Sequence, residues 1–246
     1  MRINPCLALA LAVAFGAAQA VAQPRAASPA ATRLAAGHLA SVIDQPLFLR
    51  LYRIHLPAGE HAPYDGSSSL FYDLSGAAAI DLGSGATRPL AEGAGAFIAA
   101  GQAVTISAGQ SEPSEILLFI LTARPNERWP IFDRPASTME LLRTPEPLPG
   151  LKAGPYEFSL SRVTLPIAMP AGAPESRSGA ALDYVLSGTG ALTADGKTET
   201  LPPETSLVEG FGRVHQWANP GAAPLVLLQA NVSREGEPAV VPATAK

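Results

Sequence analysis

A repeated segment constrains the fold of this chain more than any other feature. Residues Leu70–Gly76 read LFYDLSG, and residues Leu182–Gly188 read LDYVLSG. Each copy follows a Pro-Ala-Gly turn, at Pro57–Gly59 and at Pro170–Gly172. A similarity of this length at matching points of the two halves indicates an internal duplication. We therefore expect two copies of one structural unit.

Both units have the sequence pattern of β-structure. The first spans residues 42–122 and the second residues 155–233. In each, short apolar or alternating runs are separated by Gly, Pro, Ser and Asp, a pattern typical of an antiparallel sandwich or barrel. The sequence predicts an all-β protein with two tandem units, each a sandwich or a barrel.

The segments outside the two units differ from them in composition. Residues 23–41 are rich in Ala, Pro and Ser and are predicted to form a flexible lead-in. Residues 123–154 contain many prolines and are predicted to connect the units, with one helical turn near Ser137–Arg143. The polar segment 234–246 is predicted to be a disordered tail.

Residues 1–22 have the pattern of a cleaved signal peptide. Arg2 precedes a short apolar run, and alternating small residues follow as a cleavage site. A retained membrane anchor is the alternative, but the apolar run is too short to span a bilayer comfortably. The composition looks bacterial, so we expect a periplasmic or secreted protein without a stable membrane anchor.

Charge and cysteine content exclude several classes of function. The formal net charge is −4, and Lys and Arg form no cluster of the kind that binds nucleic acid. The single cysteine, Cys6, lies within the predicted signal. The mature chain is therefore expected to have no disulfide framework, thiolate nucleophile or thiolate metal ligand.

The second unit resembles the cupin superfamily. The later cupin block, G-x5-P-x-G-x2-H-x3-N, is matched at its end by Gly212, His215 and Asn219 in GRVHQWAN. The final glycine of the early block, G-x5-H-x-H-x3-4-E-x6-G, is matched by Gly188, and by Gly76 in the first copy. The resemblance implies two cupin-type barrels, each a double-stranded β-helix or jelly roll, joined by the Pro-rich connector. Such a protein is a bicupin.

The metal-binding positions of the family are degenerate in this chain. Counting back from the glycine of the early block, the carboxylate position is Ala181, and the two histidine positions are Glu175 and Arg177, or one residue earlier in each case. Only His215 of the expected ligands remains. One imidazole alone binds a metal weakly, because a catalytic site normally has about three protein ligands.

These observations favour a metal-free bicupin that binds a small ligand, which we expect to be anionic, or an envelope protein. The candidate ligand-binding residues are Glu175, Arg177, Tyr184, His215 and Trp217. Arginine and histidine would attract an anion, and the indole would form a flat apolar wall. No catalytic residue and no cofactor is predicted.

Two alternatives remain open from the sequence. The first is a metal-dependent enzyme of the cupin dioxygenase, isomerase or decarboxylase type. Its irregular site would hold a divalent ion such as Fe, Mn, Ni or Zn around His215 and Glu175. The second is an assembly module in which the barrels form a homodimer.

Overall fold

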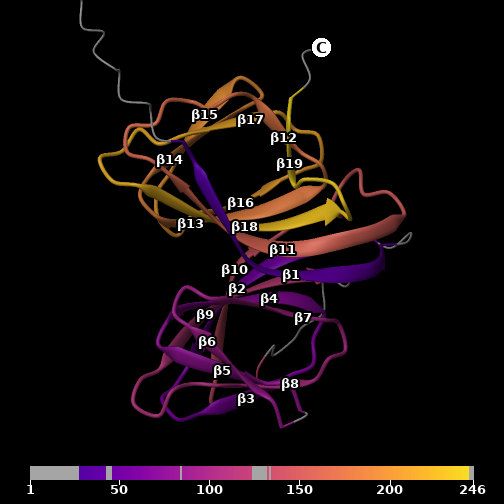
Figure 1. Ribbon diagram of the computed structural model, residues 1–246, viewed down its shortest axis with the longest axis vertical. Coiled ribbons are helices and arrows are strands. Elements are labelled where there is room, and N and C mark those ends of the chain that lie inside the picture. Colours follow the sequence, from indigo (N-terminus) through magenta and orange to yellow (C-terminus); the bar gives the residue numbers. More distant parts are fainter. Residues whose placement is uncertain (1–27, 43–45, 84, 124–131, 133, 244–246) are drawn as a thin grey trace, which may run out of the picture.

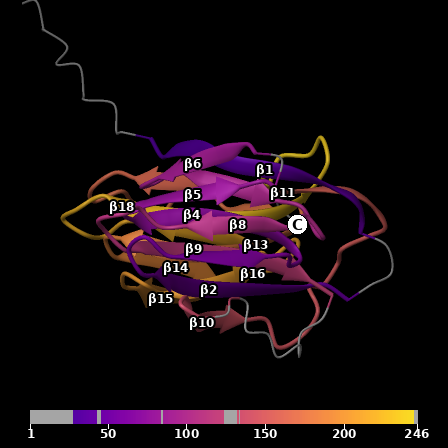
Figure 2. The same cartoon turned by 90° about the horizontal axis from the view of Figure 1, so that it is seen from below.

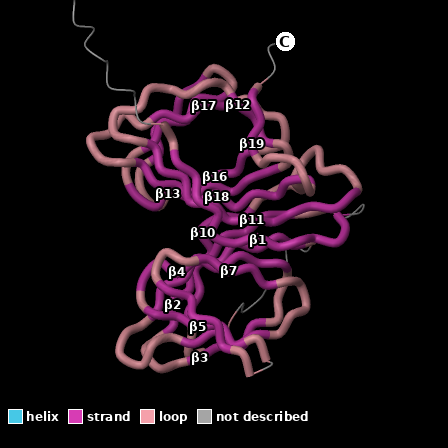
Figure 3. The backbone as a smooth tube through the Cα atoms, in the orientation of Figure 1, coloured by secondary structure: helices cyan, strands magenta, loops and turns pink. Residues whose placement is uncertain are grey.

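The protein consists of two β-barrels stacked along its long axis (Figure 1). In this computed structural model, all regular structure of the described residues is β-strand, as the tube in Figure 3 shows. None of these residues belongs to a helix that could cross a bilayer. The all-β, two-barrel prediction is confirmed. The signal predicted at 1–22 lies outside the described residues, which are 28–42, 46–83, 85–123, 132 and 134–243.

The first barrel is made of two antiparallel sheets. One has the strand order β10-β2-β9-β4-β7 and the other β3-β8-β5-β6. Its strands are β2 (Phe48–Leu56), β3 (His61–Tyr64), β4 (Ser68–Ser75), β5 (Ala77–Asp81), β6 (Thr87–Ala91), β7 (Gly95–Ile98), β8 (Val104–Ser107), β9 (Ser114–Thr122) and β10 (Ser137–Arg143).

The second barrel repeats this plan with one sheet of order β1-β11-β18-β13-β16 and another of order β15-β14-β17-β12-β19. Its strands are β1 (Ala30–Val42), β11 (Gly154–Leu165), β12 (Glu175–Arg177), β13 (Ala180–Ser187), β14 (Gly190–Ala194), β15 (Lys197–Leu201), β16 (Ser206–Glu209), β17 (His215–Ala218), β18 (Leu225–Arg234) and β19 (Val240–Pro242).

The repeated segments form equivalent strands. β4 lies between β9 and β7, and β13 lies between β18 and β16. Each strand ends at a glycine with positive φ, 98° at Gly76 and 79° at Gly188, a conformation that glycine adopts most readily. A Cβ on Gly188 would also lie 2.5 Å from the carbonyl oxygen of Pro224. The shared LSG ending is therefore explained by the tight turn that follows each strand.

Side-chain alternation along the repeated strands creates separate cores. Leu70 and Tyr72 of β4, with Leu182 and Tyr184 of β13, pack between the barrels. Phe71 points the other way, into the apolar core of the first barrel. The five-stranded sheets of the two barrels therefore face each other across a shared core. Figure 2 shows β1 and β10 at opposite edges of this stack.

The predicted flexible lead-in is largely a strand, which corrects the sequence interpretation. β1 pairs with β11 of the second barrel, from Ala30 opposite Thr164 to Val42 opposite Gly154. Leu34 also packs against the core between the barrels. The sequence does not reveal this strand, because its hydrogen-bond partners come from an edge more than a hundred residues away.

Two other segments are also strands rather than the predicted irregular structure. Residues Ser137–Arg143, expected to contain a helical turn, form β10 and pair with β2. Residues Val240–Pro242 of the predicted disordered tail form β19, which pairs with β12. In both segments a neighbouring sheet edge supplies backbone partners that local sequence does not show.

Candidate functional site

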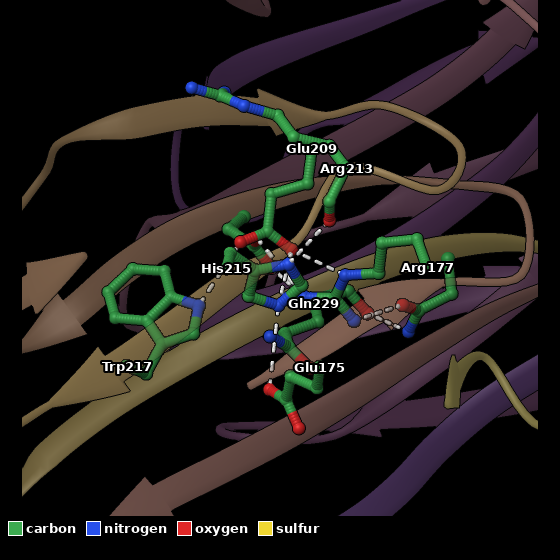
Figure 4. Close-up of polar contacts among 9 residues, drawn as sticks. Glu175, Arg177, Glu209, Arg213, His215, Trp217 and Gln229 are labelled. Carbon is green, nitrogen blue, oxygen red and sulfur yellow. Dashed lines mark hydrogen bonds and ion pairs between the residues drawn. The ribbon is translucent and has the colours of Figure 1, made fainter. Parts of the chain in front are cut away.

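The candidate site lies inside the second barrel, where buried polar side chains meet an apolar layer. Figure 4 shows Arg177 of β12, Glu209 of β16, and His215 and Trp217 of β17 converging on one another. The apolar layer consists of Leu165, Val185, Leu192, Leu201, Trp217, Leu225 and Leu227. Buried ionic side chains do not meet in this way in the described part of the first barrel's apolar core.

Arg177 is the centre of the polar cluster and is only 2% exposed. Its Nε donates to Glu209, and its other nitrogens lie 3.1 Å from Asn231 Oδ1 and 3.4 Å from both carboxylate oxygens of Asp183. The backbone holds it in place, because Gly212 N donates to the Arg177 carbonyl over 3.0 Å. A buried guanidinium with such partners is a charge-assisted anchor for the surrounding strands.

Glu209 links Arg177 to the indole of Trp217. It ends β16, opposite Ala181 of β13, and is 1% exposed. Its Oε1 accepts a hydrogen bond of 3.2 Å from Trp217 Nε1, while Oε2 accepts from Arg177. The indole orientation is therefore set by the same carboxylate that holds the guanidinium.

His215 lies between carboxylates and is 1% exposed. Its Nδ1 lies 3.2 Å from the carbonyl oxygen of Arg213, so Nδ1 carries a proton. Its Nε2 is 3.4 Å from Glu175 Oε1 and 3.4 Å from Glu209 Oε2, without a hydrogen bond of good geometry. The Nε2 atom of the imidazole therefore faces two acidic groups.

Asp183 is a buried acid with an unusual environment. Burial raises its pKa well above the usual range, the neighbouring Glu209 carboxylate raises it further, and Arg177 opposes the shift. Asp183 and Glu209 both contact the Arg177 guanidinium, so this positive charge lies between two buried carboxyl groups. The guanidinium thereby offsets part of the cost of burying the two acids.

The structure brings four of the five predicted ligand-binding residues to one side of the second barrel. Glu175 lies directly opposite His215 in neighbouring strands, and Arg177 and Trp217 complete the group. Tyr184 is the exception, because β13 turns its side chain to the core between the barrels. Its hydroxyl accepts a hydrogen bond of 2.8 Å from Arg53.

Sequence reasoning missed part of the cluster. No sequence pattern singles out Glu209, Gln229 or Asn231, and the alternation along β13 does not by itself give the direction of Asp183. The sequence does contain one signal for Asp183. It is a charged residue within the apolar run LDYVL, and a buried charge is costly without a partner. Neighbouring residues do not reveal the partners of the cluster, because Arg177 and Asn231, for example, are 54 residues apart in the sequence.

A cavity of about 370 Å³ adjoins the polar cluster. That volume lies within the range of small-molecule binding pockets. β1, β11, β12, β17, β18 and β19 contribute to its wall. The lining residues are Pro29, Ala31, Val163, Leu165, Met169, Gly172, Ala173, Glu175, Trp217, Leu227, Gln229 and Val240.

The residues present do not fit the metal ion that the cupin resemblance implies. Arg177 stands at one expected histidine position, and its guanidinium already binds the carboxylates of Glu209 and Asp183. A divalent ion at the same carboxylates would be repelled by this fixed positive charge. Within the described ranges, His, Cys, Asp and Glu form no group of three or more arranged to hold a metal.

The first barrel has apolar side chains at the described positions equivalent to those of the polar cluster. Strand pairing makes Phe71 equivalent to Asp183, Leu118 to Gln229, and Ile120 to Asn231. Phe71, Leu118 and Ile120 all belong to the apolar core that fills this barrel. The two copies have therefore diverged. The first barrel has an apolar core at these positions, and the second has an ionic cluster and a cavity.

These features define two barrels of the cupin fold, with degenerate metal-binding positions. The chain is similar to a serine-to-alanine mutant of oxalate decarboxylase OxdC from Bacillus subtilis. The alignment has a TM-score of 0.55 and 15% identity, and covers 81% of this chain and 72% of that chain. The oxalate decarboxylase structure from Bacillus subtilis at pH 4.6 matches with a TM-score of 0.53, at 15% identity, over 81% and 71% of the two chains.

A cupin 2 conserved barrel domain protein from Leptotrichia buccalis aligns over 87% of this chain and 93% of that chain, with a TM-score of 0.46 and 15% identity. No protein-family model and no curated protein matches the sequence. At such low identity, the likeness to solved structures defines the fold and not the activity.

Proposed function

We propose that this chain is a periplasmic or secreted bicupin whose second barrel binds a small molecule without a metal ion. The observation that carries the proposal is the 370 Å³ cavity beside the Arg177 cluster. In the first barrel, the equivalent space is filled by aliphatic and aromatic side chains. A mainly apolar cavity with a few polar groups is the usual form of a small-molecule site.

The contacts of Arg177 and His215 argue against an anionic ligand. Arg177 is engaged by Glu209, Asp183 and Asn231, and His215 faces two carboxylates. Neither residue belongs to the cavity wall. The proposed ligand therefore contacts Trp217 and the aliphatic wall, and the buried cluster has the role of holding that wall in shape.

Ligand titration followed by the fluorescence of Trp217 tests this proposal. Replacing Trp129 by Phe leaves Trp217 as the single tryptophan, and phenylbutanol serves as a neutral apolar probe. We expect saturable quenching or a spectral shift, and its loss in Ala173→Phe, which narrows the cavity. The matched control is Ala222→Phe, at an exposed position outside the lining. Absence of saturable binding in the parent protein would contradict the proposal.

Elemental analysis of the purified protein tests the metal-free part. We expect no stoichiometric Fe, Mn, Ni or Zn, because the donor groups are already paired with Arg177. A stoichiometric metal that disappears in His215→Ala would instead favour the enzyme alternative.

A further inference from the structure

The cavity wall has a single charged side chain, that of Glu175, among the described residues. Gln229 adds an amide, and Trp217 adds an indole whose N–H is already donated to Glu209. The remaining lining residues are apolar, or glycine. A lone carboxylate in an otherwise apolar wall gives the cavity a negative local potential.

The Glu175 carboxylate has unused capacity to accept hydrogen bonds. Its nearest ionic neighbour among the described residues is His215 Nε2, 3.4 Å from Oε1, and Nε2 forms no hydrogen bond with it. The side chain is 38% exposed and forms part of the cavity wall, so its carboxylate is accessible to a ligand. A carboxylate has about four lone-pair sites, and most of those on Glu175 remain available to a ligand.

The nearby cation does not neutralise this carboxylate directly. Arg177 lies behind the cavity wall, 1% exposed in its side chain, and its short contacts are with Glu209, Asn231 and Asp183. Trp217 lines the same cavity as Glu175. A carboxylate together with an aromatic face is the combination that recognises an ammonium group, through a charge-assisted hydrogen bond and a cation–π contact.

From this arrangement we propose that the second barrel selects small apolar amines, with Glu175 as the counter-ion of the ammonium group and the aliphatic wall around the hydrocarbon part. This inference rests on the proposed function, since it assigns the chemical class of the ligand that occupies the same cavity. Glu175 is the residue that determines specificity, and Trp217 with the aliphatic residues provides size selection.

Three probes with one carbon skeleton separate cavity binding from charge selection. Phenylbutylamine, phenylbutanol and phenylbutyrate are titrated at pH 7 into the Trp129→Phe protein, and Trp217 fluorescence is recorded. We expect the amine to bind at least about tenfold more tightly than the alcohol, which is the usual gain for a hydrogen bond to a charged group. The carboxylate should bind more weakly than the alcohol, since it faces Glu175.

Substitution of Glu175 identifies the source of the preference. Glu175→Gln should weaken binding of the amine until its affinity equals that of the alcohol. The affinity for the alcohol should stay within about twofold of the parent value. The control Glu199→Gln removes the same charge from an exposed position on β15 and should retain the preference. If alcohol and amine bind equally to the parent protein, or if Glu175→Gln keeps the preference, the amine inference is wrong while the cavity proposal stands. If none of the probes binds, the proposal that the cavity binds a small molecule is itself wrong.

Discussion

Tyr72 and Tyr184 occupy the same position of the repeated strand, and each lies beside an arginine of the opposite barrel. Arg53 of β2 donates to Tyr184 over 2.8 Å, and the positive charge of Arg162 of β11 opposes the rise that burial causes in the pKa of Tyr72. Strand pairing makes the two arginines equivalent as well. Two arginine–tyrosine pairs, related by pseudo-symmetry, thus border the core between the barrels. This arrangement is expected for a duplicated unit packed against its own copy.

The tie between Arg53 and Tyr184 should contribute modestly to stability. Arg53→Ala removes this hydrogen bond and the ion pair with the exposed Glu204, and Tyr184→Phe removes the hydrogen bond alone. We expect a coupling energy of about 0.5–1.5 kcal/mol in a double-mutant cycle measured by urea unfolding. A coupling near zero would mean that the barrels are held by their shared apolar core alone.

Arg177→Ala should strongly destabilise the protein, by about 3–5 kcal/mol, since Glu209 and Asp183 would be left buried without their counter-charge. The control Arg213→Ala removes an exposed arginine paired with Asp195 and should cost less than about 1 kcal/mol. Millimolar guanidinium should raise the melting temperature of Arg177→Ala and not that of the parent, by filling the vacated position. Equal stability of both variants would show that the cluster is not ionic in solution.

The raised pKa of Asp183 predicts a specific pH dependence of stability. Because the folded state holds this proton more tightly than the unfolded state, its contribution is present below the unfolded pKa of about 4 and is lost as pH rises through the folded pKa. Asp183→Asn should therefore gain stability relative to the parent as pH rises from about 4 to 7. Urea unfolding at several pH values measures this, with Asp195→Asn as an exposed control. A difference that moves in the opposite direction would contradict a raised pKa of Asp183.

Gly37 tests the position of β1 against the first barrel. A Cβ at this residue would overlap the ring of Phe97 in β7. We expect Gly37→Ala to lower the unfolding free energy by about 1–3 kcal/mol through overpacking, and Phe97→Leu to relieve part of that loss. Gly210→Ala, whose nearest contact would be an ordinary 3.6 Å, is the matched control. An unchanged urea midpoint for Gly37→Ala would mean that β1 does not pack on Phe97.

The sequence alone determined the architecture, because the evidence for it is local and repeated. Alternating apolar residues, turn glycines and two LSG endings predicted two β-barrels, and the departures from the cupin blocks at Glu175, Arg177 and Ala181 predicted a degenerate metal position. Each of these inferences needs only neighbouring residues or one comparison between the two copies.

Tertiary structure alone decided which side chains meet. Asp183 and Tyr184 are adjacent in sequence, yet one enters the ionic cluster and the other the core between the barrels, because a strand turns successive side chains to opposite faces. The partners of Arg177 lie on β13, β16 and β18, and β1 finds its only paired strand in β11 among the described residues. Such contacts depend on strand order and register, which distant segments fix together when the chain folds.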